Sequence, residues 1–126
     1  MNLTIGKLAK SCHVNVETIR YYQRTGLMRI PESTQSYRYY NQQDLETLSF
    51  IQKAKDAGLQ LNEIKELLTL NLEDRIQVRH VIEQRLSKID ERIQELVGLK
   101  QRLTTWLDEC KTTENECCPI LMELKQ

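Results

Sequence analysis

The stretch TIRYYQRTGL, residues 18–27, contains a short helical pattern followed by a helix stop signal. Ile19 and Tyr22 are three positions apart, as expected for the buried side of a helix. Asn15 lies just before the pattern and is a favoured N-cap residue, while Gly26 can adopt the left-handed conformation of a helix C-cap. The sequence therefore predicts a helix, VETIRYYQRT, that begins after Asn15 and ends at Gly26.

A second short helix is predicted immediately upstream. Thr4 can cap it, and Ile5, Leu8 and Ala9 follow at helical spacing until the SCHV segment at residues 11–14 ends the pattern. Two short helices joined by a tight turn are typical of a helix-turn-helix unit.

The segment LMRIPESTQSYRYYN, residues 27–41, has a different pattern. Pro31 and a Ser/Thr/Gln cluster separate a short apolar run from three tyrosines. This composition predicts a small β-hairpin, or wing. Two further helices are expected over residues 42–57, which stops at Gly58, and over residues 61–70.

A much longer helix is predicted beyond residue 73. Its apolar residues recur at alternating steps of four and three, with one slip at Lys100: Ile82, Leu86, Ile89, Ile93, Leu96, Leu99, Leu103, Trp106 and Leu107. This spacing indicates a coiled-coil seam. A helix of about 35 residues is roughly 50 Å long, so we expect it to pair with a second copy of the chain. The alternative, a helix folded onto its own chain, needs apolar surface that the remaining sequence barely supplies.

The charges are unevenly distributed, although Lys+Arg and Asp+Glu both total 18. Residues 1–60 contain eight basic and five acidic side chains, whereas residues 61–126 contain ten and thirteen. A front half with net positive charge favours a polyanionic partner. The sequence contains no nucleophile–base pair, Gly-rich phosphate loop or acid/base dyad, so we do not expect an enzyme.

The N-terminus resembles no secretory signal, and no apolar run approaches the ~20 residues of a membrane span. We therefore expect a cytoplasmic protein. In a reducing compartment the four cysteines are metal ligands, redox centres or packing residues rather than structural disulfides. Cys12, in the predicted helix-turn-helix turn, is expected to be a small buried residue.

Several side chains are candidates for contact with double-stranded DNA. A helix-turn-helix places its second helix in the major groove, where arginine can bind guanine or phosphate and threonine or tyrosine can bind the backbone. An arginine in the wing could bind phosphate. The predicted DNA-binding residues are Thr4, Asn15, Thr18, Arg20, Tyr21, Arg24, Arg38 and Tyr39.

The blocks IGKLAK, ETIRYYQRTGL and YRYYNQQDLETLSFIQKAKDAGLQLNEIKELL together resemble the MerR family of bacterial transcriptional regulators. The resemblance covers nearly the whole chain, and TIRYYxxxGL followed by YRxY is a specific signature. It implies a winged helix-turn-helix, a second helix pair and an antiparallel coiled-coil dimer. One departure is Ser36, because the family commonly has glycine two positions before the wing arginine.

The resemblance also implies a mechanism. Family members bind promoters whose −35 and −10 elements are spaced too far apart. When an effector arrives, they twist and bend that DNA for RNA polymerase. Sequence-dependent deformability of DNA would carry part of the specificity.

Three of the four cysteines lie near the C-terminus, in the segment CKTTENECCPIL that starts at Cys110. We expect Cys110 to follow the end of the long helix, and Cys118 to precede a short helix at residues 119–125 that has proline in its first turn. The eight-residue separation and the Cys-Pro-Ile sequence resemble the copper-responsive branch of the family, whose two loop cysteines hold a monovalent ion. Two thiolates suit a soft ion such as Cu(I) or Ag(I).

Other ligand sets remain open. In the branches that respond to divalent ions, a cysteine comes from the start of the partner's dimer helix, but Arg75 is near that position here and also departs from the serine of the copper branch. Cys117, with Cys110, Cys118 and His80 from the other subunit, could instead complete a site for Zn(II), Cd(II), Pb(II) or Hg(II).

A redox interpretation uses the same thiols. Cys110 could form a disulfide with Cys117 or Cys118 on oxidation. A metal-trafficking protein for which DNA is incidental is a further alternative.

The sequence thus predicts a mainly α homodimeric metal-responsive regulator. Its expected parts are a winged helix-turn-helix domain at residues 1–70, a dimerisation helix at 71–108, and a metal-binding loop with a short C-terminal helix at 109–126.

Overall fold

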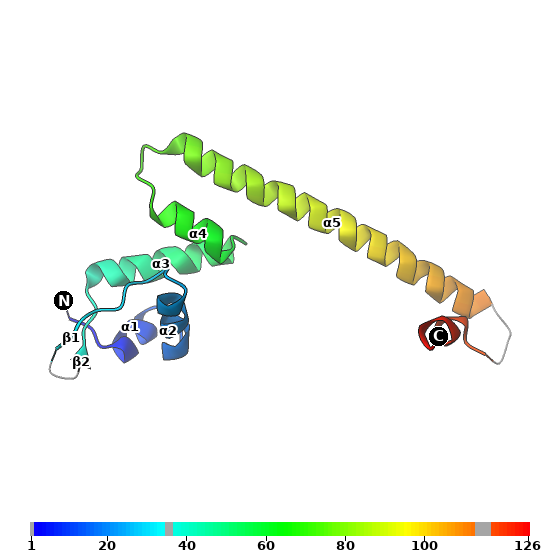
Figure 1. Ribbon diagram of the computed structural model, residues 1–126, viewed down its shortest axis with the longest axis horizontal. Coiled ribbons are helices and arrows are strands. Elements are labelled where there is room, and N and C mark those ends of the chain that lie inside the picture. Colours follow the sequence, from blue (N-terminus) through cyan, green and yellow to red (C-terminus); the bar gives the residue numbers. More distant parts are fainter. Residues whose placement is uncertain (1, 35–36, 113–116) are drawn as a thin grey trace. The chain divides into compact units, whose positions relative to one another are not determined.

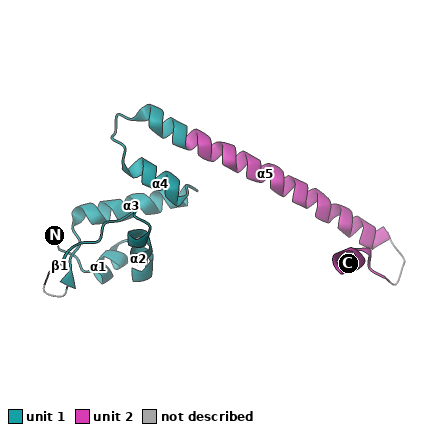
Figure 2. Ribbon diagram, in the orientation of Figure 1, with its two compact units in different colours: residues 1–81 teal, residues 82–126 magenta. Residues whose placement is uncertain are grey.

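The computed structural model describes residues 2–34, 37–112 and 117–126 (Figure 1). In chain order its elements are α1 (Ile5–Ser11), α2 (Val16–Arg24), β1 (Ser33–Thr34), β2 (Tyr37–Arg38), α3 (Gln42–Asp56), α4 (Leu61–Leu68), α5 (Arg75–Thr112) and α6 (Pro119–Leu124). The mainly helical fold with one small hairpin is confirmed. The chain divides into two compact units, residues 1–81 and 82–126 (Figure 2). This division lies within α5, and the predicted three-part functional division stays a prediction.

The helix-turn-helix is formed by α1 and α2, with the N-caps that the sequence predicts. Thr4 Oγ1 accepts a hydrogen bond from the Lys7 N–H at 3.3 Å, and Asn15 Oδ1 accepts one from the Thr18 N–H at 2.8 Å. After α2, Gly26 has φ +83°, the left-handed C-cap conformation expected of it.

The wing is a two-stranded antiparallel hairpin in which Ser33 pairs with Arg38 and Thr34 with Tyr37. Its first strand lies in the Ser/Thr cluster and not in the apolar run before Pro31. The apolar run belongs to the core instead, because Leu27 and Met28 are buried there. Ser36, the departure from the family pattern, lies outside the described residues.

The core of the first unit joins α1, α2, the segments that flank the wing, and the pair α3 and α4. Helix α3 begins at a capping box formed by Asn41 and Asp44, and α4 follows the left-handed Gly58, φ +92°. The buried apolar residues of this core are Leu8, Ala9, Ile19, Tyr22, Leu27, Met28, Tyr40, Leu48, Ile51, Ala54 and Ile64. The buried Leu27, Met28 and Tyr40 therefore anchor the two ends of the wing segment to the same core as α2.

Helix α5 has 38 residues, about 57 Å at 1.5 Å per residue. In the single chain its predicted seam is uncovered, with Ile82, Leu86, Ile89, Ile93, Leu96, Leu99, Leu103 and Leu107 all exposed. The helix also extends further than expected. The prediction that Cys110 follows its end is wrong, because α5 continues to Thr112. No proline or glycine occurs between Gly98 and Pro119, so nothing in that stretch obliges the helix to stop earlier.

The short C-terminal helix is confirmed as α6, with Cys118 as its N-cap residue and Pro119 in its first turn. Within the described ranges, none of the helices is both long and apolar enough to cross a membrane.

Candidate nucleic-acid interface and thiol site

One face of α2 presents charged and aromatic side chains to solvent. Glu17, Arg20, Tyr21 and Arg24 recur at steps of three, one and three, opposite the buried Ile19 and Tyr22. Arg20 Nη1 donates a hydrogen bond to Glu17 Oε1 at 3.1 Å, and the Arg24 guanidinium carbon lies 5.9 Å from the centroid of the Tyr21 ring. These two contacts restrain both arginines on the exposed face.

A groove of about 410 Å³ continues this face toward the wing. It brings together three of the predicted DNA-binding residues, Thr4 from the start of α1, Arg20 from α2 and Arg38 from β2. The sequence analysis did not select the other lining residues, which are Ile5, Gln23, Ser33, Tyr37 and Tyr40. Only the folded hairpin places these segments beside one another.

The remaining predicted DNA-binding residues have local partners. Asn15 Oδ1 accepts hydrogen bonds from both the backbone N–H and the hydroxyl of Thr18, each at 2.8 Å. These two side chains therefore set the start of α2. Tyr39 is exposed on the wing, and its ring centroid lies 6.5 Å from that of Tyr37.

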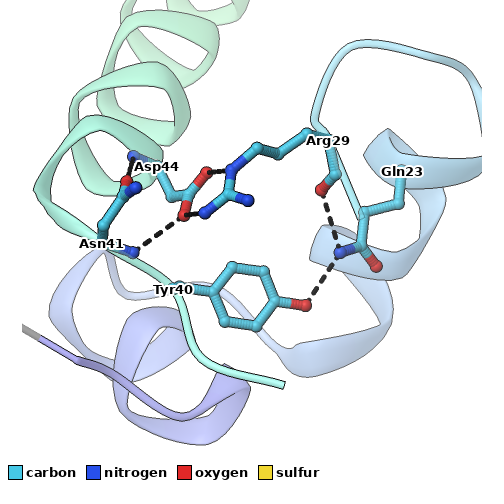
Figure 3. Close-up of polar contacts among 5 residues, drawn as sticks. All are labelled: Gln23, Arg29, Tyr40, Asn41 and Asp44. Atoms are coloured by element: carbon cyan, nitrogen blue, oxygen red, sulfur yellow. Dashed lines mark hydrogen bonds and ion pairs between the residues drawn. The ribbon is translucent and has the colours of Figure 1, made fainter. Parts of the chain in front are cut away.

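A polar network connects α2, α3 and the segments that flank the wing (Figure 3). Arg29 Nε and Nη2 each donate to a different carboxylate oxygen of Asp44 at 2.8 Å, and the Asn41 N–H donates to Asp44 Oδ2 at 2.8 Å. Gln23 Nε2 donates to the Tyr40 hydroxyl at 2.8 Å and to the Arg29 carbonyl at 3.3 Å.

The Arg29–Asp44 pair is the charged centre of this network. The Asp44 side chain is 5% exposed and that of Arg29 51%. The hydrogen bonds to Asp44 raise the pKa of Arg29 above its ordinary value, despite opposing desolvation. The sequence analysis missed both residues, and the only local signal was the capping position of Asp44. The network holds α2, α3 and the two segments that flank the wing in one arrangement.

Two thiols come together in the second unit. Cys110 is exposed in the last turns of α5, and Cys118 is the N-cap residue of α6. The backbone N–H of Leu121, with smaller contributions from that of Ile120 and from the Cys110 side chain, lowers the pKa of the Cys118 thiol. Partial desolvation opposes this shift. The contacts with the N–H groups lack the geometry of a regular cap hydrogen bond. The Cys110 side chain thus lies close enough to the Cys118 thiol to affect its pKa.

The other residues predicted at or near the metal site are Cys117, His80 and Arg75. Cys117 is exposed, and among residues 2–34, 37–112 and 117–126 no group of three or more His, Cys, Asp or Glu forms a possible metal site. His80 and Arg75 are exposed on the first turns of α5, within the first unit. Their approach to the thiols of a partner subunit stays a prediction.

Cys12, which the sequence predicts to be buried, is only partly buried and packs at the edge of the helix-turn-helix core. Burial raises the pKa of its thiol, which disfavours the thiolate that metals bind.

Comparison with known proteins agrees with this arrangement. Residues 3–70 match the MerR HTH family of regulatory proteins, and residues 45–106 match the family described as MerR, DNA binding. The mercuric resistance operon regulatory protein of Bacillus cereus is 36% identical over 129 residues, covering 98% of this chain and 98% of that protein.

Two solved structures are similar along almost their whole length. One is a transcription regulator from Ralstonia metallidurans in complex with lead(II), with a TM-score of 0.81 and 29% identity over 97% of this chain and 98% of that one. The other is MerR from Bacillus megaterium in complex with mercury(II), with a TM-score of 0.73 and 31% identity over 98% of this chain and 100% of that one.

The winged helix-turn-helix, the long helix and these two family matches lead to one conclusion: the chain belongs to the MerR family of transcriptional regulators, which are not enzymes.

Proposed function

We propose that the chain is a homodimeric, metal-responsive transcriptional regulator that binds promoter DNA and activates transcription when a thiophilic metal ion binds Cys110 and Cys118. Because its target is promoter DNA, it would act in the bacterial cytoplasm. The metal part of the proposal is supported by the position of Cys118 as the N-cap residue of α6 and by the Cys110 side chain, which helps to lower the pKa of the Cys118 thiol.

The predicted DNA-binding residues suit this function. Arg20 and Arg24 on α2 would enter the major groove, and Arg38 on β2 would bind phosphate. Because Arg20 and Arg38 line one groove, a single docking of the unit on DNA could use both.

The row of exposed leucine and isoleucine side chains on α5 supports the homodimer. A contiguous apolar stripe of this length is rarely left in water, and its four-three spacing suits an antiparallel helix from a second copy. The dimer would place two recognition helices at separated half-sites of the promoter.

The donor set favours a soft ion. Two neighbouring thiolates and no third donor in the described part of the chain suit Cu(I) or Ag(I), which accept two sulfur ligands. The similar proteins named above are associated with mercury and lead, so Zn(II), Cd(II), Pb(II) and Hg(II) stay in the candidate set, with Cys117 and the partner's His80 as additional ligands.

The thiols also suggest how the signal would travel. A metal ion held by both sulfurs would tie the last turns of α5 to the start of α6. A tie of this kind would favour one of two DNA-bound states of the dimer and so change the promoter shape that RNA polymerase meets.

The test is transcription from the protein's own promoter, in vitro, with the reduced protein titrated with Cu(I), Ag(I), Zn(II), Cd(II), Pb(II) and Hg(II). The variant Cys110→Ser/Cys118→Ser should keep promoter binding nearly intact and lose induction. Cys117→Ser is the matched control and should respond like the wild type if two thiols suffice. Unchanged induction in the double variant would refute the sensor assignment.

A thiol-redox regulator is the second candidate, because neighbouring sulfurs can also close as a disulfide. The two candidates separate under anaerobic, reducing conditions, where a metal sensor still responds to metal and a redox sensor does not.

A further inference from the structure

Glu17 lies on the exposed face of α2, the predicted DNA-binding face, where an acidic residue is unfavourable for DNA binding. It shares the exposed face of α2 with Arg20, Tyr21 and Arg24, and its side chain is 71% exposed. DNA presents a dense row of phosphates, and attraction of basic side chains to them supplies most of the sequence-independent affinity. A carboxylate on this face lowers that affinity.

A helix-stabilising role explains Glu17 only in part. It lies in the first turn of α2, where a negative charge interacts favourably with the helix dipole. Asn15 already accepts the Thr18 N–H, however, and the Glu17 carboxylate turns along the helix to accept the Arg20 Nη1 hydrogen bond at 3.1 Å.

The Glu17–Arg20 pair presents two complementary hydrogen-bonding groups. Arginine donates to O6 and N7 of guanine, and a carboxylate accepts the N4 amino group of cytosine. The two residues are three positions apart, about 4.5 Å along the helix axis, so their side chains can reach the same or adjacent base pairs. Since the Arg20 side chain is 54% exposed, part of its guanidinium stays free to meet a base.

We propose that Glu17 is a specificity-determining residue: it orients Arg20, accepts the amino group of a cytosine in each half-site, and weakens binding to all other DNA. The proposal rests on the proposed placement of α2 in the major groove. A carboxylate that repels phosphate lowers the electrostatic contribution to specific and to non-specific DNA binding alike. Because it also binds one base edge, it raises the ratio of specific to non-specific affinity.

The experiment selects binding sites from a pool of DNA duplexes with randomised positions, using the full-length wild type, Glu17→Ala and Glu17→Gln. We expect wild type to prefer a C·G pair at one position of each half-site, and Glu17→Ala to lose that preference alone. Glu17→Gln should move it toward adenine, which an amide binds through N6 and N7. Affinity for the wild-type site should fall about tenfold in Glu17→Ala, whereas affinity for an arbitrary duplex at the same salt concentration should rise.

Two control variants make the result specific. Glu46→Gln removes one exposed carboxylate from α3 and should leave base preference unchanged. Arg24→Ala should weaken binding to every duplex. If Glu17→Ala selects the same sequences as wild type, even with a lower melting temperature, Glu17 only stabilises the helix and the proposal is overturned. If Arg24→Ala also binds normally, the placement of α2 in the groove fails as well.

Discussion

His13 occupies a backbone conformation that usually favours glycine. Its φ is +56°, and it follows the C-cap of α1, where the Val14 N–H donates to the Ala9 carbonyl at 3.0 Å and the His13 N–H to the Lys10 carbonyl at 3.3 Å. This is the Schellman arrangement, in which a residue with a Cβ is strained. Gly26 and Gly58 occupy the equivalent positions after α2 and α3.

His13→Gly should therefore stabilise the protein. We expect a gain of about 0.5–1 kcal/mol in the free energy of unfolding, because relief of the left-handed strain exceeds the added entropy of the unfolded chain. The measurement is urea denaturation. Gly58→Ala is the control and should lower the free energy of unfolding. A Cβ at this position meets nothing within 4 Å, so the loss of stability comes from backbone strain alone. A destabilised His13→Gly would show that the imidazole makes a stabilising contact.

The Arg29–Asp44 pair should contribute measurably to stability. Its two parallel hydrogen bonds at 2.8 Å join a buried carboxylate to a guanidinium that solvent partly screens. A double-mutant cycle with Arg29→Met and Asp44→Asn should give a coupling energy of about 1–2 kcal/mol. For the exposed Glu17–Arg20 pair, the corresponding value should stay below about 0.5 kcal/mol. Equal coupling in the two pairs would contradict the structural role of the network in Figure 3.

At the scale of the element, α5 and α6 show how local rules determine the thiol site. An uninterrupted helical pattern carries α5 past Cys110 to Thr112, and Pro119 begins α6 directly after Cys118. Cys110 is thus presented by a helix, and Cys118 lies where the free N–H groups of the next helix begin.

Cys118 should form its thiolate at a lower pH than an unfolded cysteine. The N–H groups of Leu121 and Ile120 lower its pKa in the folded chain from the ordinary 9.0. The rate of alkylation by iodoacetamide, followed by peptide mass spectrometry, should therefore reach half its plateau at a lower pH in the native protein than in urea. Because the folded pKa is the lower one, this group stabilises the fold above pH 9.0 and loses that contribution as the pH falls through the folded pKa.

The variant Pro119→Gly/Leu121→Pro supplies the control. It removes the Leu121 N–H and weakens the first turn of α6, so the Cys118 profile should move back toward that of the urea-unfolded chain. Identical profiles in the native and unfolded wild type would contradict the predicted thiolate stabilisation.

At the scale of the whole molecule, the uncovered seam of α5 makes the chain dependent on a partner. The single variants Leu86→Glu and Leu96→Glu each place a charge on this seam, and burying it between two helices is costly. Sedimentation should show a dimeric wild type and monomeric variants at micromolar concentration. Loss of the dimer should also lower the affinity for a promoter with two half-sites, because each monomer binds only one half-site.

Gln101→Glu gives a matched control on the same helix, since Gln101 is exposed and does not belong to the predicted seam. It should stay dimeric. A monomeric wild type would overturn the dimer, and with it the arrangement of two recognition helices on one promoter.

The sequence alone determined the order of the helices and the family, because the relevant signals are local, although it placed the end of α5 too early. Asn15, Thr4 and Gly26 act within one helical turn of themselves, and the spacing of the α5 leucines requires only a regular helix. The signature around Arg20 and Arg38 then predicted the family that the comparisons confirm.

Only the tertiary structure decided which side chains meet. Gln23 contacts Tyr40 from 17 positions away, and Arg29 pairs with Asp44 across 15. Such pairs depend on how helices and wing pack around a common core, which no local pattern encodes.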